Sequence, residues 1–74
     1  MEQFVREIQK RDDCVIRIKV DNLAGYRYIE IRQYYRDEHN DFKPSKKGIT
    51  FSTSHIDELI EYLHELKRHL TQNP

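Results

Sequence analysis

The spacing of the apolar residues changes once along this sequence, near residue 52. In CVIRIKV, residues 14–20, apolar and polar residues alternate, which is the period of a strand with one buried face. After residue 52, Ile56, Leu59 and Leu63 recur at the spacing of an amphipathic helix. The change of period predicts strands first and a single helix last.

A second segment, RYIEIRQYYR (residues 27–36), is also predicted to be a strand. Ile29 and Ile31 share one face of it, and β-branched and aromatic residues are abundant. The short turn DNLAG separates this segment from residues 14–20. We therefore expect the two strands to form an antiparallel hairpin.

The polar segment RDEHNDFKPSKKG, residues 36–48, is predicted to be a hairpin connection, because Pro44 cannot donate a hydrogen bond within a central strand. It leads into GITFS, residues 48–52, which is predicted to be a short strand. The N-terminal QFVREIQKR, residues 3–11, fits either a helical turn or an edge strand, and we expect the strand. The predicted fold class is α+β, a small antiparallel sheet of about four strands followed by one C-terminal helix.

The predicted helix carries more apolar surface than one small chain can cover. A chain of 74 residues buries only about 60% of its unfolded surface, and a single cysteine cannot form an internal disulfide. Ser52 or Ser54 is expected to cap the helix. The apolar stripe of the helix comprises Ile56, Leu59, Ile60, Leu63, Leu66 and Leu70. We expect a homodimer whose interface includes Leu59, Leu63, Leu66 and Leu70.

No apolar run approaches the ~18 residues of a membrane span, so neither a membrane partner nor secretion is expected. Cys14 has no partner in the chain and is predicted to be a small core residue. A lone cysteine fits a reducing compartment, which favours an intracellular location.

The sequence contains no recognisable catalytic constellation. It lacks a Ser, His and Asp order, a Walker loop, a nucleophile elbow and a paired-cysteine metal motif. His64 and His69 are five residues apart and miss the i, i+4 spacing of helical zinc sites. We therefore expect no enzymatic turnover, no metal and no cofactor.

Charge is balanced overall but unevenly distributed. The chain has 13 basic and 13 acidic side chains, giving a net charge of zero. Asp21 and Glu30 are the acidic residues counted with the predicted strands and the lysines of the connection, whereas Asp37, Glu38 and Asp41 cluster in one acidic turn and are counted apart. The basic residues in the same segments are Arg17, Lys19, Arg27, Arg32, Arg36, Lys43, Lys46 and Lys47. This distribution predicts a basic sheet and an acidic helix.

Tyrosines accompany these basic residues. Single-stranded nucleic acid presents unstacked bases and a string of phosphates, so its binding surfaces combine flat aromatic rings with cations. The candidate residues are Arg17, Lys19, Tyr28, Arg32, Tyr34, Tyr35, Lys43, Lys46 and Lys47. Tyrosines and arginines also occur on ordinary exposed sheet faces, where they pack across strands.

The run YIEIRQYYRDEHNDFKPSKKGITFS, residues 28–52, resembles the C-terminal domain of the positive cofactor four family, transcriptional coactivators whose relatives bind single-stranded DNA. The resemblance extends over roughly residues 14–70 and rests on the combination of IEIRQYY, an acidic hairpin and KPSKKGI. It implies a homodimer with a curved antiparallel sheet and a long helix. In such a dimer, DNA strands would lie in two antiparallel grooves.

The resemblance assigns roles to individual residues. Arg32 matches the strand arginine of the family, and Tyr35 takes the place of its base-stacking tryptophan. Leu23 stands where the family has a stacking phenylalanine, so Tyr26 or Tyr28 must replace that ring if it is replaced at all. Lys43, Lys46 and Lys47 match the basic hairpin and the loop that follows it.

The orientation of the two adjacent tyrosines is left open by the sequence. Simple alternation places Arg32 and Tyr35 on opposite faces of the strand. Either Tyr34 stacks on the base, or a bulge near residue 33 reorients the strand. We favour Tyr35, with Tyr34 as the second candidate.

These patterns predict largely sequence-independent binding of single-stranded DNA, in transcriptional regulation or coactivation. If about four phosphates are neutralised per groove, log affinity falls with log salt with a slope near −3. Single-stranded RNA is an alternative ligand, because stacking and phosphate contacts do not read the 2′-hydroxyl. The other alternative is a protein-interaction module that uses the apolar stripe and the tyrosines. A partner from the transcription machinery would fit either role.

Overall fold

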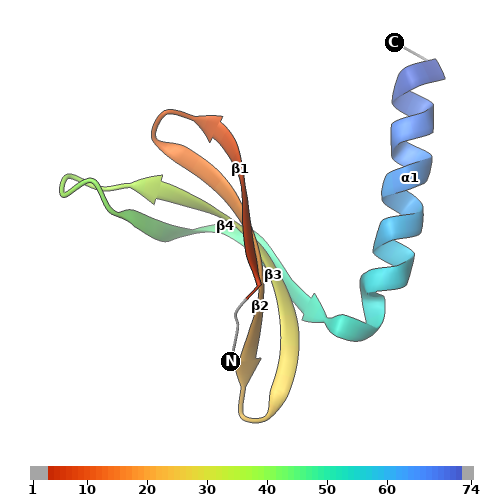
Figure 1. The fold of residues 1–74 in the computed structure, drawn as a ribbon, viewed down its shortest axis with the longest axis horizontal. Helices are drawn as coiled ribbons and strands as arrows, with labels where there is room; N and C mark the ends of the chain where they lie inside the picture. Colours follow the sequence, from red (N-terminus) through yellow and green to blue (C-terminus); the bar gives the residue numbers. More distant parts are fainter. Residues whose placement is uncertain (1–3, 73–74) are drawn as a thin grey trace.

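The computed structural model describes residues 4–72, which form one antiparallel sheet and a C-terminal helix (Figure 1). The strands follow one another across the sheet in the order β1-β2-β3-β4, so that each pairs with its neighbour in sequence. This arrangement confirms the predicted α+β fold. The elements are β1 (Val5–Arg11), β2 (Cys14–Leu23), β3 (Tyr26–Arg36), β4 (Phe42–Ser52), a 3₁₀ turn (Thr53–His55) and α1 (Ile56–Gln72).

The edge strand expected in the N-terminal segment is present as β1. Several other boundaries differ from those expected. β2 continues to Leu23, so the predicted turn is wrong except at Ala24 and Gly25, whose φ angles of 52° and 84° form a tight connection. The predicted connection over residues 36–48 is correct for residues 37–41 and wrong beyond them, because β4 already begins at Phe42. Pro44 is tolerated there because β4 is an edge strand.

The helix begins after the expected serine cap. The backbone N–H of Ser54 donates to Ser52 Oγ at 3.2 Å. A 3₁₀ turn follows this cap, and α1 itself starts at Ile56. Asp57 and Glu58 lie in its first turn, where the positive end of the helix dipole favours carboxylates.

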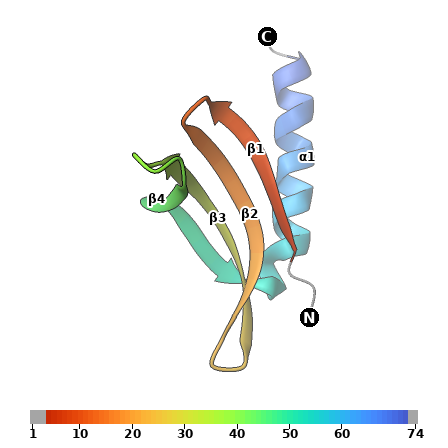
Figure 2. The same cartoon turned by 60° about the vertical axis from the view of Figure 1, so that its left-hand side comes forward.

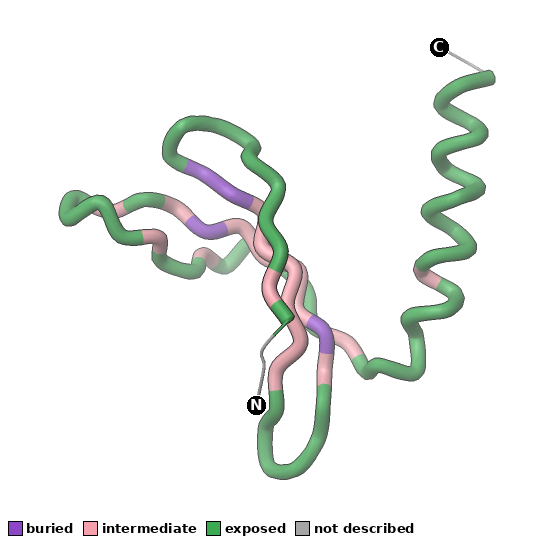
Figure 3. Tube along the Cα trace, viewed as in Figure 1, coloured by how far each residue is buried: buried purple, intermediate pink, exposed green. Residues whose placement is uncertain are grey.

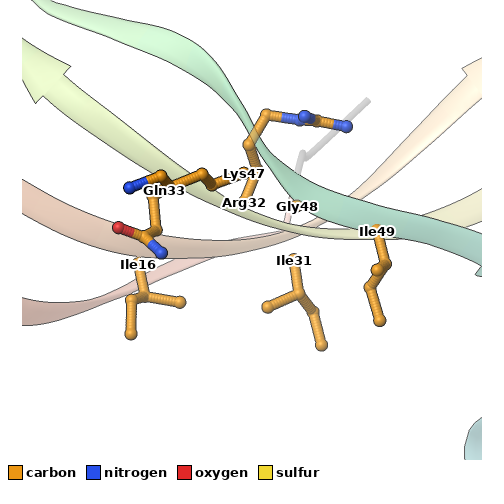
Figure 4. A pocket seen from close by; sticks show the side chains of 7 residues that line it. All are labelled: Ile16, Ile31, Arg32, Gln33, Lys47, Gly48 and Ile49. Carbon is orange, nitrogen blue, oxygen red and sulfur yellow. The ribbon is translucent and has the colours of Figure 1, made fainter.

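Strand register divides the sheet into two faces. Paired residues share a face, and the unbroken pairing of β2 with β3 joins Ile18 to Ile31 on one face and Arg17 to Arg32 on the other. Ile16, Ile31 and Ile49 point to the same side of the sheet and Arg32 to the opposite side (Figure 4). We call these the apolar face and the polar face. The same residues and their neighbours line an open cavity of about 390 Å³.

Little of the chain is buried. Among the described residues the core consists of Cys14, Val15, Ile29 and Tyr34, and the exposed fraction of Cys14 is 0%, which confirms its predicted place (Figure 3). The sheet is curved (Figure 2), and Ile8 and Ile49 on its apolar face are exposed to solvent. α1 projects away from the sheet (Figure 1), and it contains no buried residue. No described helix is long and apolar enough to cross a membrane.

The pairing of β3 with β4 contains a bulge that carries two lysines. Between the pairs Arg32↔Gly48 and Tyr34↔Pro44, Gln33 alone faces residues 45–47. The bulge is held by Ser45, whose Oγ donates to the Gln33 carbonyl at 2.8 Å and accepts the Lys47 N–H at 3.1 Å. Arg32 Nη1 donates to the Ser45 carbonyl at 2.8 Å.

Gly48 lets the two strands approach closely at the end of this bulge. A Cβ atom at Gly48 would lie 2.7 Å from the Cβ of Arg32 and 2.8 Å from its Cα. Those distances are shorter than van der Waals contact, and the nearest atoms belong to or adjoin the backbone. A larger residue therefore has to push β4 away from β3.

We predict that Gly48→Ala lowers the free energy of unfolding by about 1–3 kcal/mol, because it overpacks this contact. Urea unfolding followed by circular dichroism measures the change. Gly25→Asn is the matched control, since nothing lies within 4 Å of a Cβ there and asparagine tolerates positive φ. An unchanged midpoint for Gly48→Ala would contradict the proposed steric role.

Candidate nucleic-acid interface

Tyr34 lies at the centre of a stacked cluster on the polar face. The Arg17 guanidinium carbon is 4.1 Å from the centroid of the Tyr34 ring, a cation–π distance. Glu7, from β1, holds this guanidinium through Arg17 Nη2 at 2.6 Å and Nε at 2.7 Å. Only 6% of Tyr34 is exposed. Its ring is therefore covered by Arg17 rather than open to a base.

Glu30 joins the remaining charged groups of this face. Its carboxylate lies 3.3 Å from Arg32 Nε and 3.6 Å from Lys19 Nζ, and the Tyr34 hydroxyl donates to it at 3.4 Å. Asp21 gives Lys19 a second ion pair at 3.3 Å. The side chain of Glu30 is 14% exposed, so these partners replace most of its solvent contacts.

The pKa shifts of Asp21 and Lys19 arise from these ion pairs and hydrogen bonds. The Asn22 N–H donates to Asp21 Oδ1 at 3.0 Å, and with the Lys19 ammonium it lowers the pKa of Asp21. Burial by itself lowers the pKa of Lys19, but the hydrogen bond with Asp21 and the charge of Glu30 help to raise it overall. Both shifts favour the charged forms, so this ion pair is present at neutral pH.

The middle of the polar face is therefore electrically balanced. Arg17, Lys19 and Arg32, three of the predicted phosphate ligands, each pair with a carboxylate. The sequence predicted a surplus of positive charge on the sheet. That prediction is wrong for the middle of the polar face, because Glu7 was not counted among the residues of the sheet. No local pattern shows that β1 brings this residue beside Arg17, ten positions away.

The lysines of β4 have a different environment. Lys43, Lys46 and Lys47 are exposed. Within residues 4–72, no carboxylate lies at ion-pair distance from any of them. Lys46 and Lys47 belong to the bulge beside Arg32. The uncompensated positive charge of the candidate site thus lies along the edge of the sheet.

Tyr35 faces the other side of the sheet. Pairing of β2 with β3 is regular through Cys14↔Tyr35, because the extra residues of the bulge lie in β4. The bulge therefore does not reorient β3, and Arg32 and Tyr35 remain on opposite faces. Lys43 lies across from Tyr35 in the register, so an exposed cation borders this half-buried ring.

Sequence reasoning missed three neighbours of Tyr35. The Gln33 carboxamide oxygen accepts from the Tyr35 hydroxyl at 3.0 Å and from Lys10 Nζ at 3.1 Å. The Arg11 guanidinium carbon lies 5.9 Å from the Tyr35 ring centroid. Only a secure assignment of β1 could have placed Lys10 beside Gln33 and Arg11 beside this ring.

The remaining aromatic candidates lie toward the far hairpin. Tyr28 is half-buried on the polar face, opposite Asp21 in one neighbouring strand and Ser52 in the other. Leu23 and Tyr26 pair across the hairpin tip and are 68% and 77% exposed. Among the described residues, no three His, Cys, Asp or Glu side chains gather as a metal site.

Two kinds of comparison relate this arrangement to known proteins. The family model described as Transcriptional Coactivator p15 (PC4) matches residues 11–62. The fold is similar to that of a PC4 homologue from Burkholderia pseudomallei K96243 in two crystal forms. The orthorhombic form has a TM-score of 0.80 and 28% identity, covering 85% of each chain. The tetragonal form has a TM-score of 0.80 and 25% identity, covering 89% of this chain and 98% of that chain.

A more distant structure has the same fold. The bacteriophage T5 homologue of the eukaryotic transcription coactivator PC4, implicated in recombination-dependent DNA replication, has a TM-score of 0.71 and 17% identity. The alignment covers 97% of this chain and 81% of that chain. Comparison with curated protein sequences gives no match. The family match over most of the sequence nevertheless shows that this chain belongs to the PC4 family of transcriptional coactivators.

Proposed function

We propose that this protein binds single-stranded DNA, largely without sequence preference, and acts inside the cell in transcriptional regulation or coactivation. Membership of the PC4 family supports this function. The observation that carries it is the row of exposed lysines along β4, which no described carboxylate neutralises. A phosphate backbone, which is a string of negative charges, is the ligand that such a row of cations suits.

The proposed phosphate contacts fall into two groups. Lys43, Lys46 and Lys47 can bind phosphates directly. Arg17, Lys19 and Arg32 are also proposed as phosphate ligands, but each has an internal acidic partner. The edge of the sheet is therefore the favoured path of the backbone.

Base stacking is proposed for Tyr35, with Tyr34 and Tyr28 in assisting roles. Tyr35 is half-buried and lies opposite Lys43, so a base on its ring could place its phosphate near that lysine. Tyr34 can reach a base only through the Arg17 guanidinium that covers it, and guanidinium planes also stack on bases.

A homodimer is proposed from surfaces that the chain leaves open. On the sheet, Ile8 and Ile49 are 55% and 58% exposed. Most of the helix stripe is exposed as well, including Leu63, Leu66 and Leu70. A second copy that covers both surfaces would supply the burial that a chain of this size lacks. The interface is assigned to Leu59, Leu63, Leu66 and Leu70.

We predict that the protein binds an unstructured oligothymidine of about 20 nucleotides, longer than a typical single-strand site, in preference to its duplex. Fluorescence anisotropy at two salt concentrations measures both affinity and salt slope. Lys46→Ala/Lys47→Ala should make the slope shallower by about 1.4, since each phosphate contact on a single strand contributes about 0.7. Tyr35→Ala should weaken binding by about 1–3 kcal/mol.

Other results of these binding measurements would change the assigned surface or the assigned ligand. Unchanged affinity in both variants would refute the assigned surface. Absence of binding by the wild type would favour a module that binds a protein partner through its apolar surfaces. Equal binding of an oligouridine of the same length would extend the proposed ligand to single-stranded RNA.

We predict that Leu63→Glu dissociates the dimer. A charge at an exposed position of a monomer changes stability by only about 0.5 kcal/mol, whereas a charge buried in an interface without a partner prevents association. Sedimentation equilibrium measures the change, with Gln72→Glu as a control of the same charge on the opposite side of α1. A dimer of unchanged affinity in Leu63→Glu would refute the interface.

A further inference from the structure

The cations in the middle of the polar face point their hydrogen-bond donors at carboxylates. Both Nε and Nη2 of Arg17, the edge that best receives an oxyanion, contact one oxygen of Glu7. The Lys19 ammonium lies between Asp21 and Glu30, at 3.3 and 3.6 Å. A phosphate oxygen that approaches Arg17 finds its Nε and Nη2 donors already used by Glu7, and one that approaches Lys19 meets an ammonium shared by two carboxylates.

We propose that Glu7, Asp21 and Glu30 are built-in competitors of phosphate, so that nucleic acid engages the middle of this face by displacing internal ion pairs. This proposal rests on the proposed function. Carboxylate and phosphate oxygens are both anionic acceptors and use the same N–H donors. The three carboxylates thereby set the affinity of the site without contacting the ligand.

The displacement is energetically feasible. The side chains of Glu7 and Asp21 are 39% and 38% exposed, so each retains contact with water and can be solvated when it leaves its partner. Ion pairs of this exposure contribute little to stability. Glu30 differs, because its carboxylate is more buried and binds Lys19 and Arg32 together. Its release would free Arg32 of its carboxylate partner and leave Lys19 paired with Asp21 alone.

The proposed replacement of carboxylates by phosphates implies an order in which the cations contact nucleic acid. The β4 lysines have no described carboxylate to displace, so they meet the phosphate backbone first. Arg17, Lys19 and Arg32 contribute only as their partners leave. Nucleic acid therefore gains less from these residues than their number suggests.

Glu7→Gln tests the proposal most directly. Glutamine keeps the size of the side chain and one weak acceptor, but it removes the charge that competes for Arg17. Glu7 lies on an edge strand and is substantially exposed, so the fold should tolerate the change. We expect oligothymidine affinity to rise roughly two- to fivefold. The salt slope should steepen by about 0.7, because one more cation neutralises a phosphate.

Two comparisons separate local competition from a general change of net charge. Glu61→Gln, on α1, removes the same charge away from the sheet and should leave affinity within the error of the wild type. In an Arg17→Gln background, Glu7→Gln should bring no further gain, because no cation remains to be released. Asp21→Asn provides an independent test of the same behaviour at Lys19.

The results of these measurements separate a failure of the competition proposal from a failure of the proposed function. Tighter binding by Glu7→Gln and Asp21→Asn, with the gain at Glu7 dependent on Arg17, supports competition. If the wild type binds oligothymidine but both variants bind no more tightly than Glu61→Gln, competition is refuted and the proposed function stands. A gain in affinity from Glu7→Gln that persists in the Arg17→Gln background also refutes competition. A wild type that does not bind oligothymidine refutes both proposals.

Discussion

The architecture depends on one constraint, which is that a single chain has too few residues to bury the apolar surfaces of its own sheet and helix. A four-stranded sheet has two faces, and the single α-helix of residues 4–72 extends away from both of them. Few residues are buried, while isoleucines of the sheet and leucines of the helix remain in solvent. Since hydrophobic burial provides most of the favourable free energy of folding, such a chain is marginal alone. The proposed second copy would turn these open surfaces into the main core.

The other requirement is that one strand serve two purposes. β4 has to stay paired with β3 and also present its lysines outward. The bulge achieves both, because Ser45 hydrogen-bonds across it and Gly48 restores close pairing beyond it. The pairing of β2 with β3 stays regular throughout. Positive charge is thus concentrated at the sheet edge, while the balanced ion pairs occupy the middle.

The order of elements could be predicted because alternation in β2 and β3 and helical spacing in α1 persist over many residues. The start of β4 could not, since Pro44 and consecutive lysines are atypical of strands, and an edge strand needs hydrogen bonds on only one side. Alternation also correctly separated Arg32 from Tyr35. The neutralising role of Glu7 depends on the register of β1, which no local pattern specifies.

The simple order of the strands has a consequence for folding kinetics. Every strand pair is closed by a short connection, such as Ala24–Gly25 between β2 and β3, so the entropy lost on closing each loop is small. Low sequence separation between contacting residues favours rapid assembly of the sheet. α1 shares few of these contacts. In the proposed dimer, its packing becomes a bimolecular step, whose rate rises with protein concentration while the rate of sheet formation does not.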